Sequence, residues 1–169
     1  MKLSLFDYQL SSERIAQSPL SCRSSSRLLY ANTNGTIEDR YFFDLPSMLR
    51  SNDLLILNDT RVLLARLVAY KEQGRGRVEI LVERQIDPYT CLAQVRASNK
   101  LKVGTCLVTG KGSKFVVRSQ VKAFYELHIT SECDLGGVLA HEGLVPIPPY
   151  IQRAALPKDR ERYQTIYAR

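Results

Sequence analysis

The sequence has few of the residues that build metal centres and disulfide frameworks. Its four cysteines are scattered, and none belongs to a Cys-x-x-Cys pair that would hold zinc or an iron–sulfur cluster or act as a redox couple. The two histidines, His128 and His141, would need ligands from distant segments to complete a metal site, so we expect no metal. Isolated thiols are typical of a reducing compartment, and we expect a cytoplasmic protein.

Long apolar runs and an excess of glycine or proline are missing as well. The longest apolar runs, 54–57 and 62–64, fall far short of the roughly 18 residues that a membrane helix needs. The first residues lack the basic and then apolar pattern of a secretory signal. With 9 glycines and 7 prolines in 169 residues, the chain is neither collagen-like nor of low complexity. We therefore expect a folded protein with no membrane partner.

Positive charge and an ordinary hydrophobic content are what the sequence does have. Lys and Arg number 24 against 17 Asp and Glu, for a net charge of +7, and 44% of the residues are hydrophobic. A length of 169 residues predicts about one domain, or a core with a small insertion. The charge favours a polyanionic partner such as RNA, although charge alone does not establish binding.

The first part of the chain predicts a short helix, a hairpin and a buried strand. Ser11 and Ser12 can cap a helix over 11–17. Strands over 27–31 and 36–44 flank an Asn-Gly pair that suits a tight turn. The continuous apolar run in 53–57 predicts a strand buried on both faces.

The middle of the chain is rich in β-forming residues separated by turn signals, which predicts a small barrel or sandwich. The expected strands of this part are 78–82, 91–95, 105–108, 115–117 and 123–129, and they follow a separate core strand expected over 62–70. Asp134 can cap a helix over 134–141. Prolines make 145–151 extended, and a helix over 157–168 would present Tyr163, Ile166 and Tyr167 as an apolar face. No later segment receives that face, so we expect that further chain normally follows.

The first candidate site is the polar run Asn58-Asp59-Thr60-Arg61 between two apolar segments. One interpretation is a turn in which Asn58 or Asp59 caps its own backbone and Arg61 pairs with a carboxylate. The other is a functional site, in which the Asp59 carboxylate takes a proton or accepts hydrogen bonds from hydroxyls and the Arg61 guanidinium binds an anion.

Two further candidates contain arginine. One is the stiff apolar segment Pro148-Pro149-Tyr150, with Arg153 just beyond it. A base would stack on this segment, or the segment would serve only as an extended spacer. Arg23 and Arg27 lie in a serine-rich loop, where they would bind phosphate or be ordinary surface residues.

Taken together and in order, several of these segments resemble the amino-terminal half of the S-adenosylmethionine:tRNA ribosyltransferase-isomerase family of queuosine biosynthesis. The resemblance spans nearly the whole chain, and the ordered set is far more specific than one Asn-Asp-Thr-Arg run. The segments are 15–20, 23, 26–29, 53–62, 65–67, 145–151 and 161–168.

The resemblance implies a mixed α/β, barrel-like core domain formed by 1–70 and 145–169, with a small all-β barrel or sandwich domain inserted at 71–144. Family members continue for about as many residues again, so the core is expected to be truncated at its carboxyl end. A separate carboxyl-terminal half is then an expected partner, and the full-length family implies a monomer.

The implied reaction uses S-adenosylmethionine as a ribosyl donor and needs no metal. The ribosyl unit is added to the aminomethyl group of a deazaguanine at the tRNA wobble position and rearranged to the epoxide of epoxyqueuosine, with release of adenine and methionine. Two alternatives stay open for this chain, a non-enzymatic RNA-binding fragment and an inactive truncated remnant.

The resemblance also implies roles for the candidate residues. Asp59 would be the base or a hydroxyl acceptor, and Arg61 would hold a carboxylate or phosphate. The candidate substrate-binding residues are Asn58, Thr60, Arg23, Arg27, Tyr150, Arg153, Tyr163 and Gln164.

Overall fold

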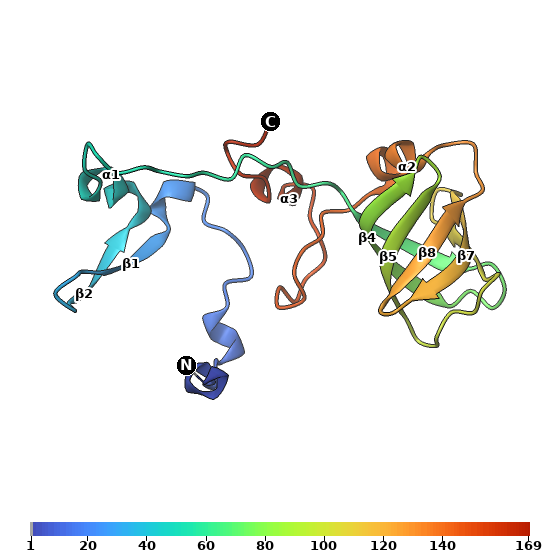
Figure 1. Ribbon diagram of the computed structural model, residues 1–169, viewed down its shortest axis with the longest axis horizontal. Coiled ribbons are helices and arrows are strands. Elements are labelled where there is room, and N and C mark those ends of the chain that lie inside the picture. The colour runs from blue at the N-terminus through green and yellow to red at the C-terminus, as the bar shows by residue number, and fades with distance from the viewer. Residues whose placement is uncertain (1) are drawn as a thin grey trace. The chain divides into compact units, whose positions relative to one another are not determined.

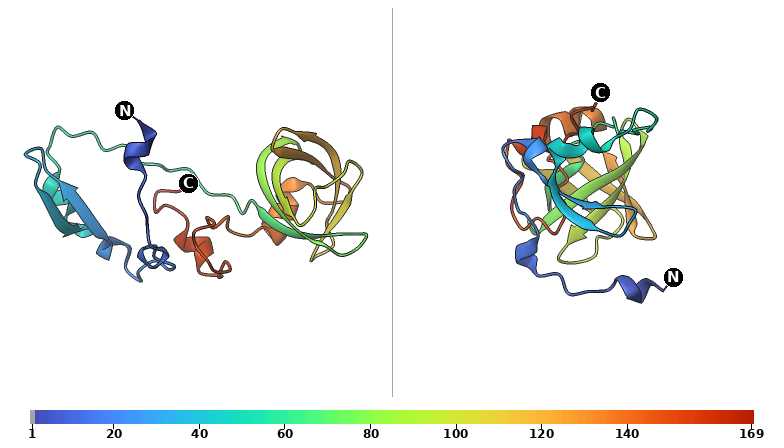
Figure 2. Two further views of the ribbon diagram at one scale, coloured as in Figure 1. Left: turned by 90° about the horizontal axis from the view of Figure 1, so that it is seen from below. Right: turned by 90° about the vertical axis from the view of Figure 1, so that its left-hand side faces the viewer.

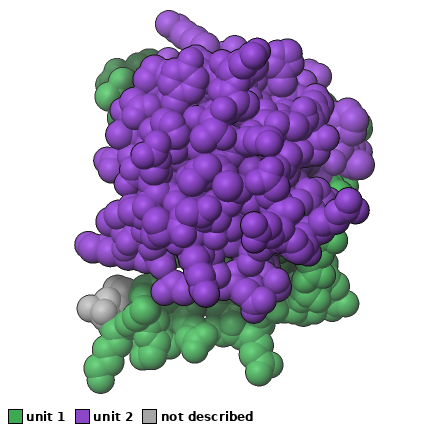
Figure 3. Space-filling view, turned by 90° about the vertical axis from the view of Figure 1, so that its right-hand side faces the viewer, with its two compact units in different colours: residues 1–58, 149–154 green, residues 59–148, 155–169 purple. Residues whose placement is uncertain are grey.

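A computed structural model describes residues 2–169, which divide into two compact units (Figure 3). Unit 1 contains the chain up to Asn58 together with Pro149–Ala154. Unit 2 contains Asp59–Pro148 and Ala155–Arg169. The sequence-based domain boundaries at 70/71 and 144/145 stay a prediction.

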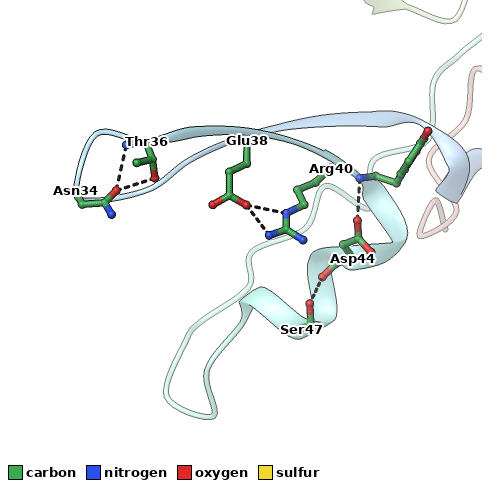
Figure 4. A network of polar contacts seen from close by, with 7 residues as sticks. Asn34, Thr36, Glu38, Arg40, Asp44 and Ser47 are labelled. Carbon is green, nitrogen blue, oxygen red and sulfur yellow. Dashed lines mark hydrogen bonds and ion pairs between the residues drawn. The ribbon is translucent and has the colours of Figure 1, made fainter.

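Unit 1 is built on a β-hairpin. Strands β1 (Arg27–Ala31) and β2 (Ile37–Tyr41) pair antiparallel, with Arg27 opposite Tyr41 and Ala31 opposite Ile37. Gly35 has φ 85°, a value that L side chains disfavour and that the turn requires. Asn34 Oδ1 accepts hydrogen bonds from the backbone N of Thr36 at 3.0 Å and its Oγ1 at 2.8 Å (Figure 4). The predicted hairpin is therefore confirmed.

Short helical turns make up the remaining regular structure of unit 1. A 3-10 turn, η4 (Phe42–Asp44), and helix α1 (Leu45–Met48) follow β2, and Asp44 accepts from the backbone N of Tyr41 at 2.9 Å (Figure 4). Two more 3-10 turns are η1 (Leu3–Phe6) and η3 (Arg23–Ser25). The helix predicted over 11–17 is only the 3-10 turn η2 (Ser12–Arg14), because Ser11 makes no side-chain capping bond and the backbone is extended again at Ile15.

Unit 2 contains a closed antiparallel β-barrel (Figures 1 and 2). The order around the barrel is β3-β4-β5-β8-β7-β6, and β6 pairs back to β3. The strands are β3 (Arg66–Lys71), β4 (Arg77–Asp87), β5 (Thr90–Ala97), β6 (Cys106–Thr109), β7 (Lys114–Val121) and β8 (Phe124–Ile129). Of the barrel and the sandwich predicted for the middle of the chain, the structure forms the barrel. Strand β3, which the prediction assigned mostly to the core segment, belongs to the barrel as well.

The barrel core follows the two-residue period of its strands. Alternate side chains point inward and are fully or nearly fully buried. Helix α2 (Leu135–Glu142) adds Leu135 and Val138 to the same core. The Leu135 backbone N donates to Pro88 O at 2.8 Å, and Asp134 Oδ1 accepts from the Gly137 backbone N at 2.8 Å. The predicted cap and helix are confirmed, and α2 lies over the barrel end that carries the β4–β5 turn.

The buried strand predicted over 53–57 is wrong. Residues 53–65 form neither helix nor strand, and Leu54 and Ile56 are 86% and 84% exposed. An apolar run becomes a strand when neighbouring strands satisfy its backbone groups and cover its faces. Within residues 2–169 no strand pairs with this run, so the barrel begins only at Arg66.

The segments predicted to form a mixed α/β core, 1–70 and 145–169, do not form one within residues 2–169. They contribute the β1–β2 sheet, β3 and short helical turns, and no mixed α/β sheet is formed by the described residues. The predicted helix over 157–168 is only α3 (Asp159–Arg162). A longer helix would need its apolar face packed, and Ile166 remains 69% exposed. The chain as described is thus mainly β.

Candidate functional site

The run after Asn58 is an extended, exposed piece of backbone. Asp59, Thr60 and Arg61 are all exposed. The Asp59 carbonyl accepts from the Arg169 backbone N at 3.2 Å, and its carboxylate lies 4.0 Å from Arg169 Nε. Both side chains are mostly exposed, so this ion pair is weak and screened by salt. The carboxylate is therefore accessible to a ligand.

Gln164 holds this run in place. Its Oε1 accepts from the Val62 backbone N and its Nε2 donates to the Val62 carbonyl, both at 2.8 Å. One side chain thus satisfies both backbone groups of a residue that has no strand partner. The contact brings Val62, the residue after Arg61, next to the 161–168 motif, although 102 positions separate the two partners.

A second contact network, within unit 1, centres on Gln17. The Gln17 side chain donates to the Tyr150 carbonyl at 3.2 Å and accepts from the Gln152 backbone N at 2.6 Å. The Gln17 carbonyl accepts from Arg153 Nε at 2.7 Å. The Tyr150 side chain is 57% exposed, so its ring is available for stacking while its backbone is fixed.

The two remaining candidate arginines lie in different elements of unit 1, since Arg27 is the first residue of strand β1 and not part of the predicted serine-rich loop. Arg27 pairs with Asp39 at 3.2 Å on an exposed surface, and Arg23 lies in η3. Hydrogen bonds from Ser24 and Ser25 lower the pKa of the Cys22 thiol to about 7. These contacts leave phosphate binding by the loop a prediction.

Some of the predicted site residues thus form one group in each unit. The structure brings Gln164 to the Asp59–Arg61 run in unit 2, and it brings Arg153 and Tyr150 to Gln17 in unit 1. Sequence reasoning assigned no role to Gln17 or Arg169. Gln17 could have been suspected because it lies in the 15–20 segment, whereas no sequence signal marks Arg169.

Two negative findings concern residues 2–169. Within this range no group of three or more His, Cys, Asp or Glu side chains is placed to hold a metal ion. None of the helices formed there has the length and hydropathy that crossing a membrane requires.

Comparison with known proteins gives consistent similarities. The profile described as queuosine biosynthesis protein matches residues 3–169. A relative from Aromatoleum aromaticum, named S-adenosylmethionine:tRNA ribosyltransferase-isomerase, is 45% identical over 164 residues, covering 97% of this chain and 47% of the relative. A relative of the same name from Nitrosococcus oceani is 43% identical over 169 residues, covering 99% and 49%.

A solved structure is also similar in sequence. The crystal structure of S-adenosylmethionine tRNA ribosyltransferase from Thermotoga maritima is 31% identical, with 82% of this chain and 48% of that chain covered and a TM-score of 0.42. The chain spans about half the length of the curated relatives it matches.

Proposed function

Because the chain belongs to the queuosine biosynthesis protein family, we propose that it takes part in the S-adenosylmethionine:tRNA ribosyltransferase-isomerase reaction. In that reaction the ribosyl unit of S-adenosylmethionine is added to the aminomethyl group of the deazaguanine at the tRNA wobble position and rearranged to the epoxide of epoxyqueuosine, while adenine and methionine are released. The observation that carries the proposal is 43–45% identity to enzymes of that name over at least 97% of this chain.

The reaction requires a base that removes a proton beside the positively charged sulfur and an acid that assists the departure of adenine. We assign the base, or a hydroxyl acceptor, to Asp59. Its accessible carboxylate and the hydrogen bonds that hold the backbone at Asp59 and Val62 support this role. Arg61 holds a carboxylate or phosphate, and Asn58 and Thr60 hydrogen-bond the substrate or fix the turn.

The remaining candidates contact tRNA in this proposal. The exposed ring of Tyr150 stacks on a base, and Arg153 orients the segment that carries it through its bond to the Gln17 carbonyl. Arg23 and Arg27 bind phosphate. Tyr163 lies beside Gln164 in the segment that supports the Asp59 run, where 38% of its surface is exposed.

A complete site needs more than this chain in our proposal. Residues 1–70 and 145–169 belong to an α/β core domain with 71–144 inserted, and the core is completed by a segment equivalent to the unmatched half of the relatives. The exposed apolar run at Leu54–Leu57 supports this, because it has the pattern of a buried strand and no cover within residues 2–169.

Adenine release tests the proposal. The chain is mixed with S-adenosylmethionine and tRNA carrying the aminomethyl-deazaguanine, with and without a polypeptide equivalent to the part of the Aromatoleum aromaticum relative that this chain does not match. We expect adenine only when both polypeptides are present, since one half-site cannot position both substrates. Asp59→Asn should lower the rate at least about 100-fold, the usual contribution of a positioned base.

The matched control is Asp7→Asn, which makes the same change at an exposed position and should keep the full rate. A reconstituted pair that releases no adenine would contradict the proposal. Adenine release unaffected by Asp59→Asn would contradict the role of that carboxylate.

A non-enzymatic RNA-binding role is the second candidate, and the net charge of +7 favours it. This role predicts that the chain binds tRNA but that no adenine is released, even when the second polypeptide is present. The adenine-release assay therefore separates the two functions.

A further inference from the structure

The two ends of the β-barrel in unit 2 are built differently. Helix α2 lies over one end, where its first residue bonds to Pro88 and Glu142 accepts from the Lys111 backbone N at 3.2 Å. The opposite end carries the loops 72–76, 98–105 and 122–123, which join β3 to β4, β5 to β6 and β7 to β8. We call these loops and the strand ends beside them the open end.

The open end concentrates positive charge. Three acidic residues, Glu72, Glu79 and Glu126, lie there among a larger set of cations. The cations are Lys71, Arg75, Arg77, Arg96, Lys100, Lys102, Arg118 and Lys122. The end covered by α2 has no such excess, with Glu83, Asp87, Glu132, Asp134 and Glu142 against Arg66, Arg84, Lys111 and Lys114. The basic residues of this unit are therefore segregated rather than spread evenly.

Most of this positive charge is not neutralised by ion pairs. Arg77 pairs with Glu79 at 2.7 Å. Glu72 pairs at 3.2 Å with Lys114, whose side chain extends from the start of β7 to the open end. Among residues 2–169, Lys71, Lys100 and Lys102 form no ion pair. These ammonium groups are free to attract an external anion.

The same three lysines line a hollow of about 380 Å³ together with the polar side chains Gln73, Asn99 and Thr105. Glu72 is the one acidic residue in this lining, and its carboxylate pairs with Lys114. Backbone hydrogen bonds fix the rim of the hollow. The Glu72 N donates to Cys106 O at 3.0 Å, and the Gly104 N donates to Val117 O at 2.8 Å. The cations therefore sit on loops tied to the barrel, which reduces the ordering needed to bind a ligand.

An aromatic side chain lies near the hollow without lining it. Tyr70 of β3, next to Lys71 in the chain, is 42% exposed and pairs across the strands with Arg77 of β4. Unpaired cations, amide and hydroxyl groups and an exposed ring are the combination that binds phosphates and stacks bases of RNA. An acidic protein surface would not need the aromatic platform.

We propose that the open end of the barrel binds the phosphate backbone of RNA, with Lys71, Lys100 and Lys102 at its centre. None of the residues assigned a role in the proposed reaction belongs to this surface. It deepens the proposed function and rests on it, because the RNA is then the tRNA substrate.

The test compares two charge-matched double variants of the 169-residue chain. Lys100→Gln/Lys102→Gln neutralises the open end, and Arg84→Gln/Lys111→Gln removes the same charge from the covered end. Affinity for an unmodified tRNA transcript is measured by fluorescence anisotropy over a range of salt concentrations. Circular dichroism melting of each variant shows that the barrel is folded.

We expect the open-end variant to bind tRNA about tenfold more weakly, with a salt slope reduced by about 1.4 to 1.8 for two lost phosphate contacts. The covered-end variant should stay within about twofold of the wild type. Equal weakening by both variants would overturn the proposal, since it would show attraction to net charge alone. Binding of each variant to phosphatidylserine vesicles is measured in parallel. If Lys100→Gln/Lys102→Gln abolished vesicle binding and left tRNA affinity unchanged, the proposal would be overturned in favour of a membrane-binding surface.

The adenine assay separates this proposal from the proposed function. If tRNA affinity depends on Lys100 and Lys102 but the reconstituted pair releases no adenine, the surface stands and the enzymatic function fails. If adenine is released and tRNA affinity is independent of these lysines, the enzymatic function stands and the surface proposal is wrong.

Discussion

Val62 depends on a single glutamine for both of its backbone hydrogen bonds. Gln164→Ala removes them, and two partly buried hydrogen bonds contribute roughly 1 to 3 kcal/mol together. The Val62 amide should therefore exchange with solvent roughly 5- to 150-fold faster. Hydrogen–deuterium exchange of the peptide containing Val62, read by mass spectrometry, measures this. Gln120→Ala, which removes a side-chain bond to the Lys122 carbonyl, is the control and should leave Val62 unchanged.

Unchanged protection of Val62 in the Gln164 variant would show that another contact holds the Asp59 run. The distinction matters for function, because a carboxylate that acts as a base must be held within hydrogen-bond reach of its proton. In unit 1, a glutamine likewise joins distant segments, because the Gln17 side chain donates to the Tyr150 carbonyl and the Gln17 carbonyl accepts from Arg153 Nε.

Helix α2 is fastened to the β6–β7 turn through Glu142. Its carboxylate accepts from Ser113 Oγ and from the Lys111 backbone N. Burial raises the pKa of Glu142, but hydrogen bonds from Ser113, Thr109 and Lys111 outweigh it, so the pKa lies below its ordinary 4.5. A depressed pKa means that the stabilisation is complete above about pH 4.5 and is lost as the pH falls through the lower, folded-state pKa.

Urea unfolding from about pH 6 to about pH 3 should therefore show a larger loss of unfolding free energy for the wild type than for Glu142→Gln. Glu132→Gln, a matched change at an exposed position just before α2, should follow the wild type. Parallel pH curves for the wild type and Glu142→Gln would rule out this carboxylate as the acid-sensitive link between helix and turn.

The whole molecule exposes several large apolar side chains, among them Leu3 at 88%, Leu54 at 86% and Ile56 at 84%. Apolar surface of this kind seeks a partner. We expect the chain alone to self-associate as its concentration rises, in sedimentation velocity experiments. Leu54→Ser/Ile56→Ser should shift the distribution toward monomer, whereas Ile86→Ser/Val103→Ser, also at exposed positions, should not.

Adding the second polypeptide should suppress self-association if it covers the 54–57 run. A monomer at every concentration, or self-association that is unaffected by Leu54→Ser/Ile56→Ser, would mean that the 54–57 run does not mediate self-association. The outcome bears on the proposed α/β core, because the same run is the strand that the core would bury.

Local pattern was sufficient to predict the hairpin, the barrel strands and α2. The Asn34-Gly35 pair defines its turn, alternation of apolar residues defines each barrel strand, and Asp134 caps its helix. Each of these rests on neighbours a few positions away or on a pattern that every strand repeats. The ordered motifs likewise identified the family before any contact was known.

Tertiary structure alone decided the contacts between distant residues. The apolar run at Leu54–Leu57 has the pattern of a strand but stays exposed, because a strand also needs partners that pattern does not specify. Gln164 reaches Val62, Gln17 reaches Arg153, and eight cations meet at one barrel end, because the path of the chain brings them together. Sequence determines which chemical groups are available, and the path of the folded chain, including the closed strand order of the barrel, determines which of them become neighbours.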